Sequence, residues 1–386
     1  MSVTTRKMRL ATVLGSALPL ILIAACGSSS ESSGESTGLT GTVELSTISD
    51  LTGRAGFGGK ANKLGQDIAL EEINSSGFLG DAKLKLVVED TASETQQAAI
   101  LANKAIRSKT PLLLGPLLSP VCQVVAPLVQ SKKLPTIFTQ GGADGINVGE
   151  YTYRATMPGK ELIPKLGPFL SDKGIKTISL IHDTDSDAGP LYANETIPAF
   201  AEKYDMKIVS KKGVLSSVND FTSIASGITK DNPDAVGVIL VGAQNVTVIK
   251  QLRQAGYKGQ IFAQAGAGGG TLTPLGALGD GVVWASDYHA ESVDPGNKKF
   301  LELWSAKYPD QQPINLNAEG YDQVWLAARA LKEANSTDRE KVAAALKKVT
   351  DAGFDGAVGK VTFEDRDEQV AGVIIEWKGG KETLAQ

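Results

Sequence analysis

Residues suited to nucleophilic or metal chemistry are few and poorly grouped in this chain. Its 386 residues include two histidines, His182 and His289, and two cysteines, Cys26 and Cys122. The histidines are far apart without ligand-like spacing, and no Gly-x-Ser-x-Gly sequence occurs. No Ser-His-Asp or Cys-His set can be assembled from them. We therefore predict that the protein is not an enzyme and has no resident metal or cofactor.

Two local patterns resemble ion-binding or phosphate-binding motifs without completing them. Asp183, Asp185 and Asp187 begin like a calcium loop, but the glycine and glutamate that should follow each stand one position late. The glycine-dense segment 266–270 lacks the spacing of a phosphate cradle. We interpret these glycines as positions where backbone approaches closely in a cleft.

The stretch from Leu112 to Gln130 could bind an anion. Leu112–Leu114 and the glycine after them read as a buried strand, and a short turn leads to Ser119 and Pro120. Ser119 suits a helix N-cap and Pro120 the first helical position, and valines and leucines then recur at helical spacing. A helix N-terminus beyond a strand can hold an anion, although an ordinary helix start gives the same pattern.

The N-terminus predicts export. Arg6, Lys7 and Arg9 precede the uncharged stretch Leu10–Ala25, which is too short to span a bilayer comfortably and is typical of a secretory signal at 1–25. The ending Ile-Ala-Ala-Cys26 resembles the lipobox of bacterial lipoproteins, which implies a lipid on Cys26. The Ser/Gly-rich segment 26–41 then reads as a flexible tether. We expect an extracytoplasmic protein that a lipid holds to the cell membrane.

Composition limits the remaining choices. Without residues 1–25 the chain has 36 basic and 43 acidic residues, a net charge of −7, which disfavours nucleic acid as a partner. Only Cys122 remains besides Cys26, so no intramolecular disulfide is expected in the mature chain. The length beyond the tether favours two domains.

Strand and helix patterns alternate in two series. Expected strands are 43–48, 84–88, 112–115 and 135–138 in the first series, and 177–182, 207–209, 235–241, 260–263 and 282–286 in the second. Helices are expected between them and at about 297–307, 318–334 and 339–349, and a closing hairpin at 359–377. This alternation predicts an α/β fold with two doubly wound, parallel-sheet lobes.

The last helices need a sheet to cover, so we expect the chain to return to the first lobe. The predicted first lobe comprises 42–156 and 286–345, and the second comprises 157–285 and 346–386. This arrangement requires three crossovers, which would act as a hinge.

The segment Thr42–Lys381 resembles the type I periplasmic binding proteins of branched-chain amino acid ABC transporters. Three passages carry the resemblance: the first strand, turn and helix from Val43, the second strand and its helix at 84–102, and Leu114–Thr139. The resemblance implies a non-enzymatic solute-binding protein that works with an ABC permease.

The same resemblance implies a set of ligand-binding residues. Ser119 stands where the family offers a hydroxyl to the ligand carboxylate, and Pro120 leaves Val121 and Cys122 as the backbone donors. Phe57 stands where the family has an aromatic over the ligand, and Gln140, Gly141 and Gly142 follow the fourth strand. The other lobe would supply polar contacts, and we expect these from Asp187, Gln244 and Gln264.

Two departures from the family pattern leave the ligand open. Ala188 replaces an aromatic of the second lobe, and Gln264 to Gly266 lack the acidic residue that holds a ligand ammonium. A small carboxylate without an amine therefore fits as well as an amino acid, unless Asp187 supplies the acid.

We predict a monomeric substrate-binding lipoprotein of an ABC importer that captures a small carboxylate-bearing solute by hinge closure. The alternative is a ligand-sensing lipoprotein of the same fold that signals to a receptor. A secreted hydrolase is disfavoured because no catalytic set was found.

Overall fold

A computed structural model describes residues 38–186, 188–240 and 242–385 of the chain. The predicted signal segment, Cys26 and most of the tether therefore lie outside the described residues. The tether ends early, because Leu39 packs against the core and its N–H donates to the Asn335 side chain at 3.1 Å. Among the described helices, we find none with the length and apolar character that a membrane crossing needs.

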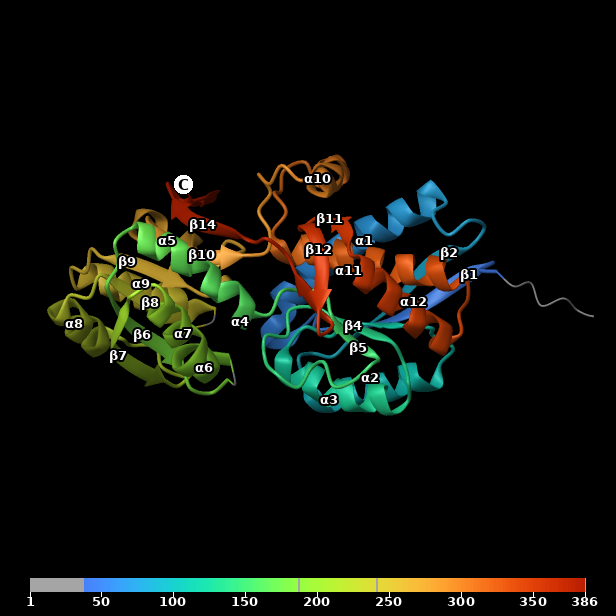
Figure 1. Ribbon diagram of the computed structural model, residues 1–386, viewed down its shortest axis with the longest axis horizontal. Helices are drawn as coiled ribbons and strands as arrows, with labels where there is room; N and C mark the ends of the chain where they lie inside the picture. The colour runs from blue at the N-terminus through green and yellow to red at the C-terminus, as the bar shows by residue number, and fades with distance from the viewer. Residues whose placement is uncertain (1–37, 187, 241, 386) are drawn as a thin grey trace, which may run out of the picture. The chain divides into compact units, whose positions relative to one another are not determined.

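The described chain forms two sheets, each with its own helices, which we call the first and second lobes (Figure 1). The first sheet has the order β11-β12-β13-β5-β4-β3-β1-β2 and the second β15-β14-β10-β9-β8-β6-β7. The strands of the first sheet are β1 (Thr42–Ser49), β2 (Lys83–Asp90), β3 (Leu113–Leu114), β4 (Thr136–Phe138), β5 (Thr152–Arg154), β11 (Phe354–Gly356), β12 (Gly359–Glu364) and β13 (Asp367–Gln369). Those of the second are β6 (Thr177–Asp183), β7 (Lys207–Val214), β8 (Ala235–Ile239), β9 (Gln260–Ala263), β10 (Val282–Ser286), β14 (Val373–Lys378) and β15 (Lys381–Leu384).

Helices cover both faces of each sheet, as the doubly wound prediction requires. The first lobe contains α1 (Gly56–Ser76), α2 (Thr95–Arg107), α3 (Ser119–Ser131), α10 (Pro295–Lys307), α11 (Asn315–Ala334) and α12 (Arg339–Ala352). Figure 1 shows α1, α11 and α12 on one side of its sheet and α2 and α3 on the other. The second lobe contains α4 (Gly159–Leu162), α5 (Leu166–Asp172), α6 (Ala188–Leu191), α7 (Ile197–Lys203), α8 (Thr222–Asp231) and α9 (Ala243–Gln254). Here α5 and α7 pack on one face and α8 and α9 on the other.

Both sheets are parallel in the middle and antiparallel at one edge. The strands β1 to β5 pair in parallel, as do β6 to β10 wherever they are neighbours. At the edge of the first sheet, β12 pairs antiparallel with both β11 and β13. At the edge of the second sheet, β14 pairs antiparallel with both β10 and β15. Each lobe is therefore a mixed sheet dominated by parallel pairing, where the sequence predicted a parallel one.

The predicted boundary that gave 346–386 to the second lobe is wrong for 346–369. Helix α12 packs on α11, and β13 pairs with β5 through Asp367 and Arg154, so this segment belongs to the first lobe. Only β14 and β15 extend the second sheet. The predicted closing hairpin is in fact two hairpins, one turning at Asp365 and Arg366 and the other at Gly379 and Gly380, all with positive φ.

The chain crosses between the lobes three times, at 155–158, after β10, and at 370–372. These crossovers place the carboxyl ends of the parallel strands of both lobes near one another. In open α/β sheets, ligands bind at such strand ends.

Helices α1 and α11 touch backbone to backbone. A Cβ built on Gly65 would lie 1.8 Å from the Asn317 carbonyl oxygen, and one on Gly320 would lie 2.1 Å from the Asn62 carbonyl oxygen. The Asn317 amide also donates to the Ala61 carbonyl at 2.7 Å. Only glycine permits this approach, which holds the first turns of α11 against α1.

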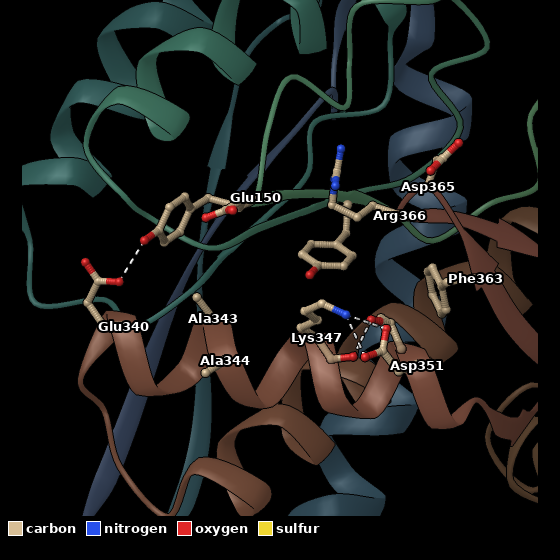
Figure 2. A pocket seen from close by; sticks show the side chains of 12 residues that line it. Glu150, Glu340, Ala343, Ala344, Lys347, Asp351, Phe363, Asp365 and Arg366 are labelled. Carbon is tan, nitrogen blue, oxygen red and sulfur yellow. Dashed lines mark hydrogen bonds and ion pairs between the residues drawn. The ribbon is translucent and has the colours of Figure 1, made fainter.

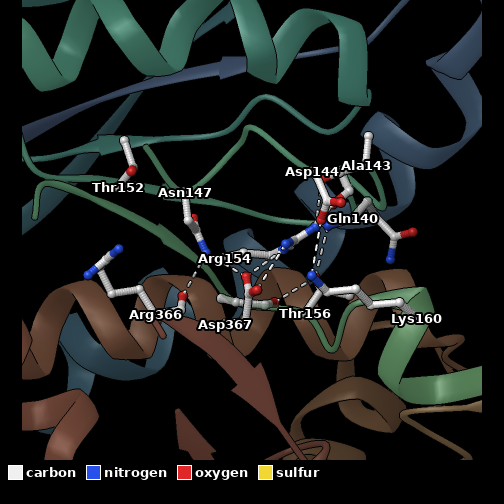
Figure 3. Close-up of polar contacts among 12 residues, drawn as sticks. Gln140, Ala143, Asp144, Asn147, Thr152, Arg154, Thr156, Lys160, Arg366 and Asp367 are labelled. Carbon is white, nitrogen blue, oxygen red and sulfur yellow. Dashed lines mark hydrogen bonds and ion pairs between the residues drawn. The ribbon is translucent and has the colours of Figure 1, made fainter. Parts of the chain in front are cut away.

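Arg154 ties the end of β5 to two other segments (Figure 3). Its Nε and Nη2 donate to the two oxygens of Asp367 on β13 at 2.7 and 3.0 Å. Its Nη1 donates to the carbonyls of Gly141 and Ala143 in the loop after β4. The Arg154 side chain is 3% exposed and that of Asp367 14%, so this bidentate pair is largely withdrawn from water.

We predict that Gly65→Ala destabilises the protein, because the new methyl group overlaps the α11 backbone. The expected loss in the free energy of unfolding is about 2–3 kcal/mol. Gly227→Ala is the matched control, since Gly227 lies exposed in α8 with open space around its Cβ position. That change should stabilise the helix by up to about 1 kcal/mol. Urea unfolding measures both, and equal stability of the two variants would contradict the close packing.

Arg154→Met is also predicted to destabilise the protein, because it leaves the Asp367 carboxylate without its cation and two carbonyls without their donor. Removal of one partner from such a pair costs about 3 kcal/mol. The control is Lys347→Met, which removes an exposed pair with Asp351 on α12 and should have little effect. If both variants unfold at the same urea concentration as the parent, the role of Arg154 is wrong.

Candidate functional site

A cavity of about 280 Å³ lies where the two lobes and the crossovers meet. We call it the cleft. The first lobe contributes residues of α3, α11 and the loop after β4, and the second contributes α4, α6 and the loop after β9. Its apolar walls come from Leu117, Leu118, Met157, Leu162 and Ile163. A group bound here would contact both lobes at once.

The start of α3 forms one wall of the cleft. Ser119 is the first helical residue and Leu118 the N-cap, so the prediction of Ser119 as the N-cap is wrong by one position. The Asp50 carboxylate accepts from the N–H groups of Leu117 and Leu118 at 3.0 and 3.2 Å. Ser119 Oγ accepts from the Ala143 N–H at 3.2 Å. Ser119 therefore lines the cleft and joins α3 to the loop after β4.

Two predicted donors do not reach the cleft. The N–H groups of Val121 and Cys122 donate to the Leu118 carbonyl at 3.0 and 2.8 Å, and both residues are fully buried. The Cys122 thiol donates to the Pro116 carbonyl, and burial raises its pKa well above the usual value. The helix itself uses these donors, so their assignment as ligand contacts is wrong.

The loop after β4 lies where the sequence predicted. Gln140, Gly141 and Gly142 all line the cleft. The Gln140 N–H donates to Thr156 Oγ1 at 2.9 Å, which connects this loop to the first crossover. A Cβ on Gly142 would lie 2.9 Å from the Tyr192 hydroxyl, so this glycine lets the first lobe approach the second.

The residues predicted from the second lobe have different positions. Gln264 lines the cleft, and its amide donates to the Leu240 carbonyl at 2.7 Å. Gln244 lies outside the cleft, because its buried amide donates to the Leu215 and Val218 carbonyls. That assignment is wrong. Asp187 lies outside the described residues.

Phe57 lies beside the cleft rather than in it. Its side chain is 66% exposed, and its ring is 3.8 Å from a Cβ built on Gly269 in the glycine-dense segment of the second lobe. Gly269 and Gly270 both have positive φ, which explains the glycines at this close approach. Phe57 as a ligand contact stays a prediction.

Sequence reasoning missed the aromatic of the second lobe. Tyr192 follows α6 and lines the cleft one turn beyond Ala188, the residue that stands in the family's aromatic position. Burial raises its pKa to about 12, with Arg154 partly opposing this, so the hydroxyl keeps its proton. Tyr192 could have been predicted as a cleft residue because it lies near the start of a helix that follows a strand, β6.

Sequence reasoning also missed two acids, Asp287 and Glu319. Asp287 follows β10 in the second crossover, Glu319 lies in the second turn of α11, and both line the cleft while 4% and 1% exposed. Glu319 accepts from the amides of Gln140 and, at 2.9 Å, Asn315. Burial raises the pKa of both acids, and for Glu319 the charge of Asp287 adds to this rise. The sequence did offer one signal for Glu319: it is an acidic residue on the face of α11 that is otherwise buried.

Two of the aspartates that resemble a calcium loop, Asp183 and Asp185, are used by nearby backbone N–H groups. Asp183 Oδ1 accepts from the N–H groups of Asp185 and Ser186, and Asp185 Oδ2 accepts from that of Ser216. In the described part of the chain, no group of three or more His, Cys, Asp or Glu side chains is arranged to hold a metal ion.

A larger cavity of about 480 Å³ lies within the first lobe, between α12 and the loops around β5 (Figure 2). Several of its charged groups have partners: Glu340 accepts from the Tyr151 hydroxyl at 2.7 Å, and Lys347 pairs with Asp351 at 2.7 Å. All its lining residues belong to one lobe. A ligand here would not sense the separation of the lobes, so we assign the candidate site to the cleft.

Known proteins share this architecture over nearly the whole described chain. A family model described as periplasmic binding protein matches residues 42–379. A leucine-, isoleucine-, valine-, threonine- and alanine-binding protein of Pseudomonas aeruginosa is 24% identical over 85% of this chain and 87% of its own length.

Solved structures agree with this relationship. A leucine-binding protein from Thermotoga maritima superposes with a TM-score of 0.79 and 27% identity, over 89% of this chain and 98% of that one. A solute-binding protein of an ABC transporter from R. palustris, in complex with benzoate, gives a TM-score of 0.76 at 21% identity over 89% and 95%.

Members of this family are extracytoplasmic, non-enzymatic components that bind small solutes and work with ABC permeases, as the sequence predicted for this chain. The family model spans most of the chain, and both lobes and their connections match the relatives. The chain therefore belongs to the type I periplasmic binding proteins of the branched-chain amino acid ABC transporter family.

Proposed function

We propose that this protein is the lipid-anchored solute-binding component of an ABC importer and captures a small carboxylate-bearing solute in the cleft. The observation that carries the proposal is a cavity whose walls come from both lobes and from the crossovers. Its volume of about 280 Å³ is at the small end for ligand sites, which suits a solute of amino-acid or benzoic-acid size.

The carboxylate would bind at the start of α3. This helix has 13 residues, and its N-terminal end carries the partial positive charge of the helix dipole. Ser119 Oγ and the protonated Tyr192 hydroxyl both line the cavity and can donate to carboxylate oxygens. The ligands named for two relatives are five amino acids (leucine, isoleucine, valine, threonine and alanine) and benzoate, which share a carboxylate and differ in the rest.

Capture would work by hinge closure. Three crossovers connect the lobes, so rotation about them changes the width of the cleft without unfolding either sheet. A solute that contacts Ser119 in one lobe and Tyr192 in the other favours the closed state by its differential affinity. The closed state is then the form that a permease would recognise.

The lipid anchor is part of the proposal. The signal at 1–25 and the lipobox at Cys26 support it, and the described domain begins only at about Gly38. The segment between them would let a monomeric binding domain reach a permease while it stays attached to the membrane.

A thermal-shift screen with amino acids, aliphatic carboxylic acids and aromatic carboxylic acids is the direct test of solute capture. We expect at least one small carboxylate to raise the Tm, because a ligand that binds only the folded state stabilises it by about 2.7 kcal/mol at one hundred times its Kd. No shift with any of these solutes would contradict the proposal. Co-purification with a receptor in place of a permease would identify the sensory alternative.

Ser119→Ala should weaken binding of the solute found in that screen. Loss of one hydroxyl contact to a charged group costs roughly 1–2 kcal/mol of binding free energy. Ser131→Ala is the control, because Ser131 lies exposed at the other end of α3 and donates only to the Leu128 carbonyl among the described residues. Calorimetric titration measures both, and an unchanged Kd for the Ser119 variant would remove this residue from the site.

A further inference from the structure

Two carboxyl groups meet at one wall of the cleft without a cation. Asp287 and Glu319 come from the second crossover and from α11, both line the cleft, and their buried carboxyl groups are close enough to affect the pKa of each other. Within the described residues, no Lys, Arg or His forms an ion pair with either of them. The donors that face Glu319 are the neutral amides of Gln140 and Asn315.

A third acid near this pair, Glu368, has no hydrogen-bond donor among the described residues. Glu368 lies on β13 and is 1% exposed, and both its carboxyl oxygens are buried and accept no hydrogen bond from the described residues. It interacts electrostatically with Glu319, Asp287 and Asp322. Glu368 does not line the cleft, but its carboxyl group acts on the pair that does. These three acids together exceed the donors that the described residues offer them, which is what a site for a cationic group requires.

Two adjacent buried carboxyls cannot both ionise without a compensating charge, so they hold one proton between them. Other groups around the pair do not change this. The titratable neighbours of the pair are Glu368, Asp322 and the Tyr288 hydroxyl. Asp322 accepts from the Ala357 and Val358 N–H groups and has Arg329 near it. Farther along the first lobe, Arg154 is paired with Asp367. The main causes of the raised pKa values of Asp287 and Glu319 are burial and neighbouring carboxyl groups, and no arginine is among them.

We propose that Asp287 and Glu319 form the cation-recognition pair of the cleft and exchange their shared proton for the ammonium group of a zwitterionic solute. The proton on the carboxyl oxygen leaves to solvent, and the resulting carboxylate pairs with the ammonium nitrogen. This inference rests on the proposed function, since it concerns the same cleft. The segment after β9 lacks the acidic residue that holds a ligand ammonium in the family. In this proposal, Glu319 on α11 and Asp287 in the second crossover take over that role.

The exchange makes binding depend on pH in a defined direction. The pair holds its proton in the free cleft and loses it in the complex, so binding strengthens as pH rises. As pH falls below the pKa that the pair has in the free cleft, the affinity falls by up to about tenfold per pH unit. A solute that has a carboxylate but no amine would leave the proton in place.

The test compares matched solutes on the full chain. Isothermal titration is done with L-leucine, L-isoleucine, L-valine, L-threonine and L-alanine, with their 2-hydroxy acid counterparts, and with benzoate. Each titration is repeated in two buffers of different ionisation enthalpy, which reports the number of protons exchanged. We expect binding of at least one amino acid with release of close to one proton, and binding of its 2-hydroxy counterpart weaker by roughly 30-fold or more.

Glu319→Gln adds a variant test. Its amide oxygen can still accept from Gln140, so the fold should persist, but it cannot release the proton. We expect loss of proton release and at least roughly 30-fold weaker amino-acid binding. Glu291→Gln is the control, since Glu291 is an exposed acid in the same crossover and should change neither quantity.

The outcomes separate this inference from the proposed function. Tight binding of a 2-hydroxy acid or benzoate, or amino-acid binding without proton release, overturns the role of the pair and leaves solute capture intact. Binding of neither series contradicts the pair and solute capture together. The proton count on the parent protein decides the question even if the Glu319 variant does not fold.

Discussion

The backbone contact between α1 and α11 is the constraint on which the cleft depends. α1 follows the first strand, whereas α11 comes more than 230 residues later, after the chain has built most of the second lobe. Gly65 and Gly320 allow the two helices to pack directly. α11 can lie there only if the chain returns to the first lobe, and the crossovers follow from that return. The same contact places Glu319, the neighbour of Gly320, at the wall of the cleft.

A second set of interactions fixes the backbone of the first-lobe wall. Asp50 accepts from the N–H groups before α3, Ser119 accepts from Ala143, and Arg154 donates to Gly141 and Ala143 while it pairs with Asp367. These bonds connect β1, α3, the loop after β4, β5 and β13. The wall is therefore preorganised, and binding energy can go into closing the lobes rather than into ordering loops.

The sequence was sufficient for features that depend on local pattern, and insufficient for those that depend on the returning chain. Buried parallel strands read as apolar runs, so strand ends, and with them Ser119, Gln140 to Gly142 and Gln264, could be placed at the cleft. Val121, Cys122 and Gln244 were misplaced because nearby carbonyls use their donors. Asp287 and Glu319 were missed because a long-range crossing brings them to the cleft. The lobe of 346–369 was misassigned because β13 pairs with a strand over 200 residues earlier.

The central claim is that a solute held between the lobes draws them together, and an interlobe distance measures this directly. Cys122 is fully buried, so in a chain with Cys26→Ser, cysteines introduced at exposed Ile100 on α2 and Leu215 after β7 can be labelled selectively for single-molecule energy transfer. Addition of a solute that raises the Tm should convert a broad or open distance distribution into a narrow, closed one, with a midpoint at the calorimetric Kd. An unchanged distribution at saturating solute would contradict capture by closure.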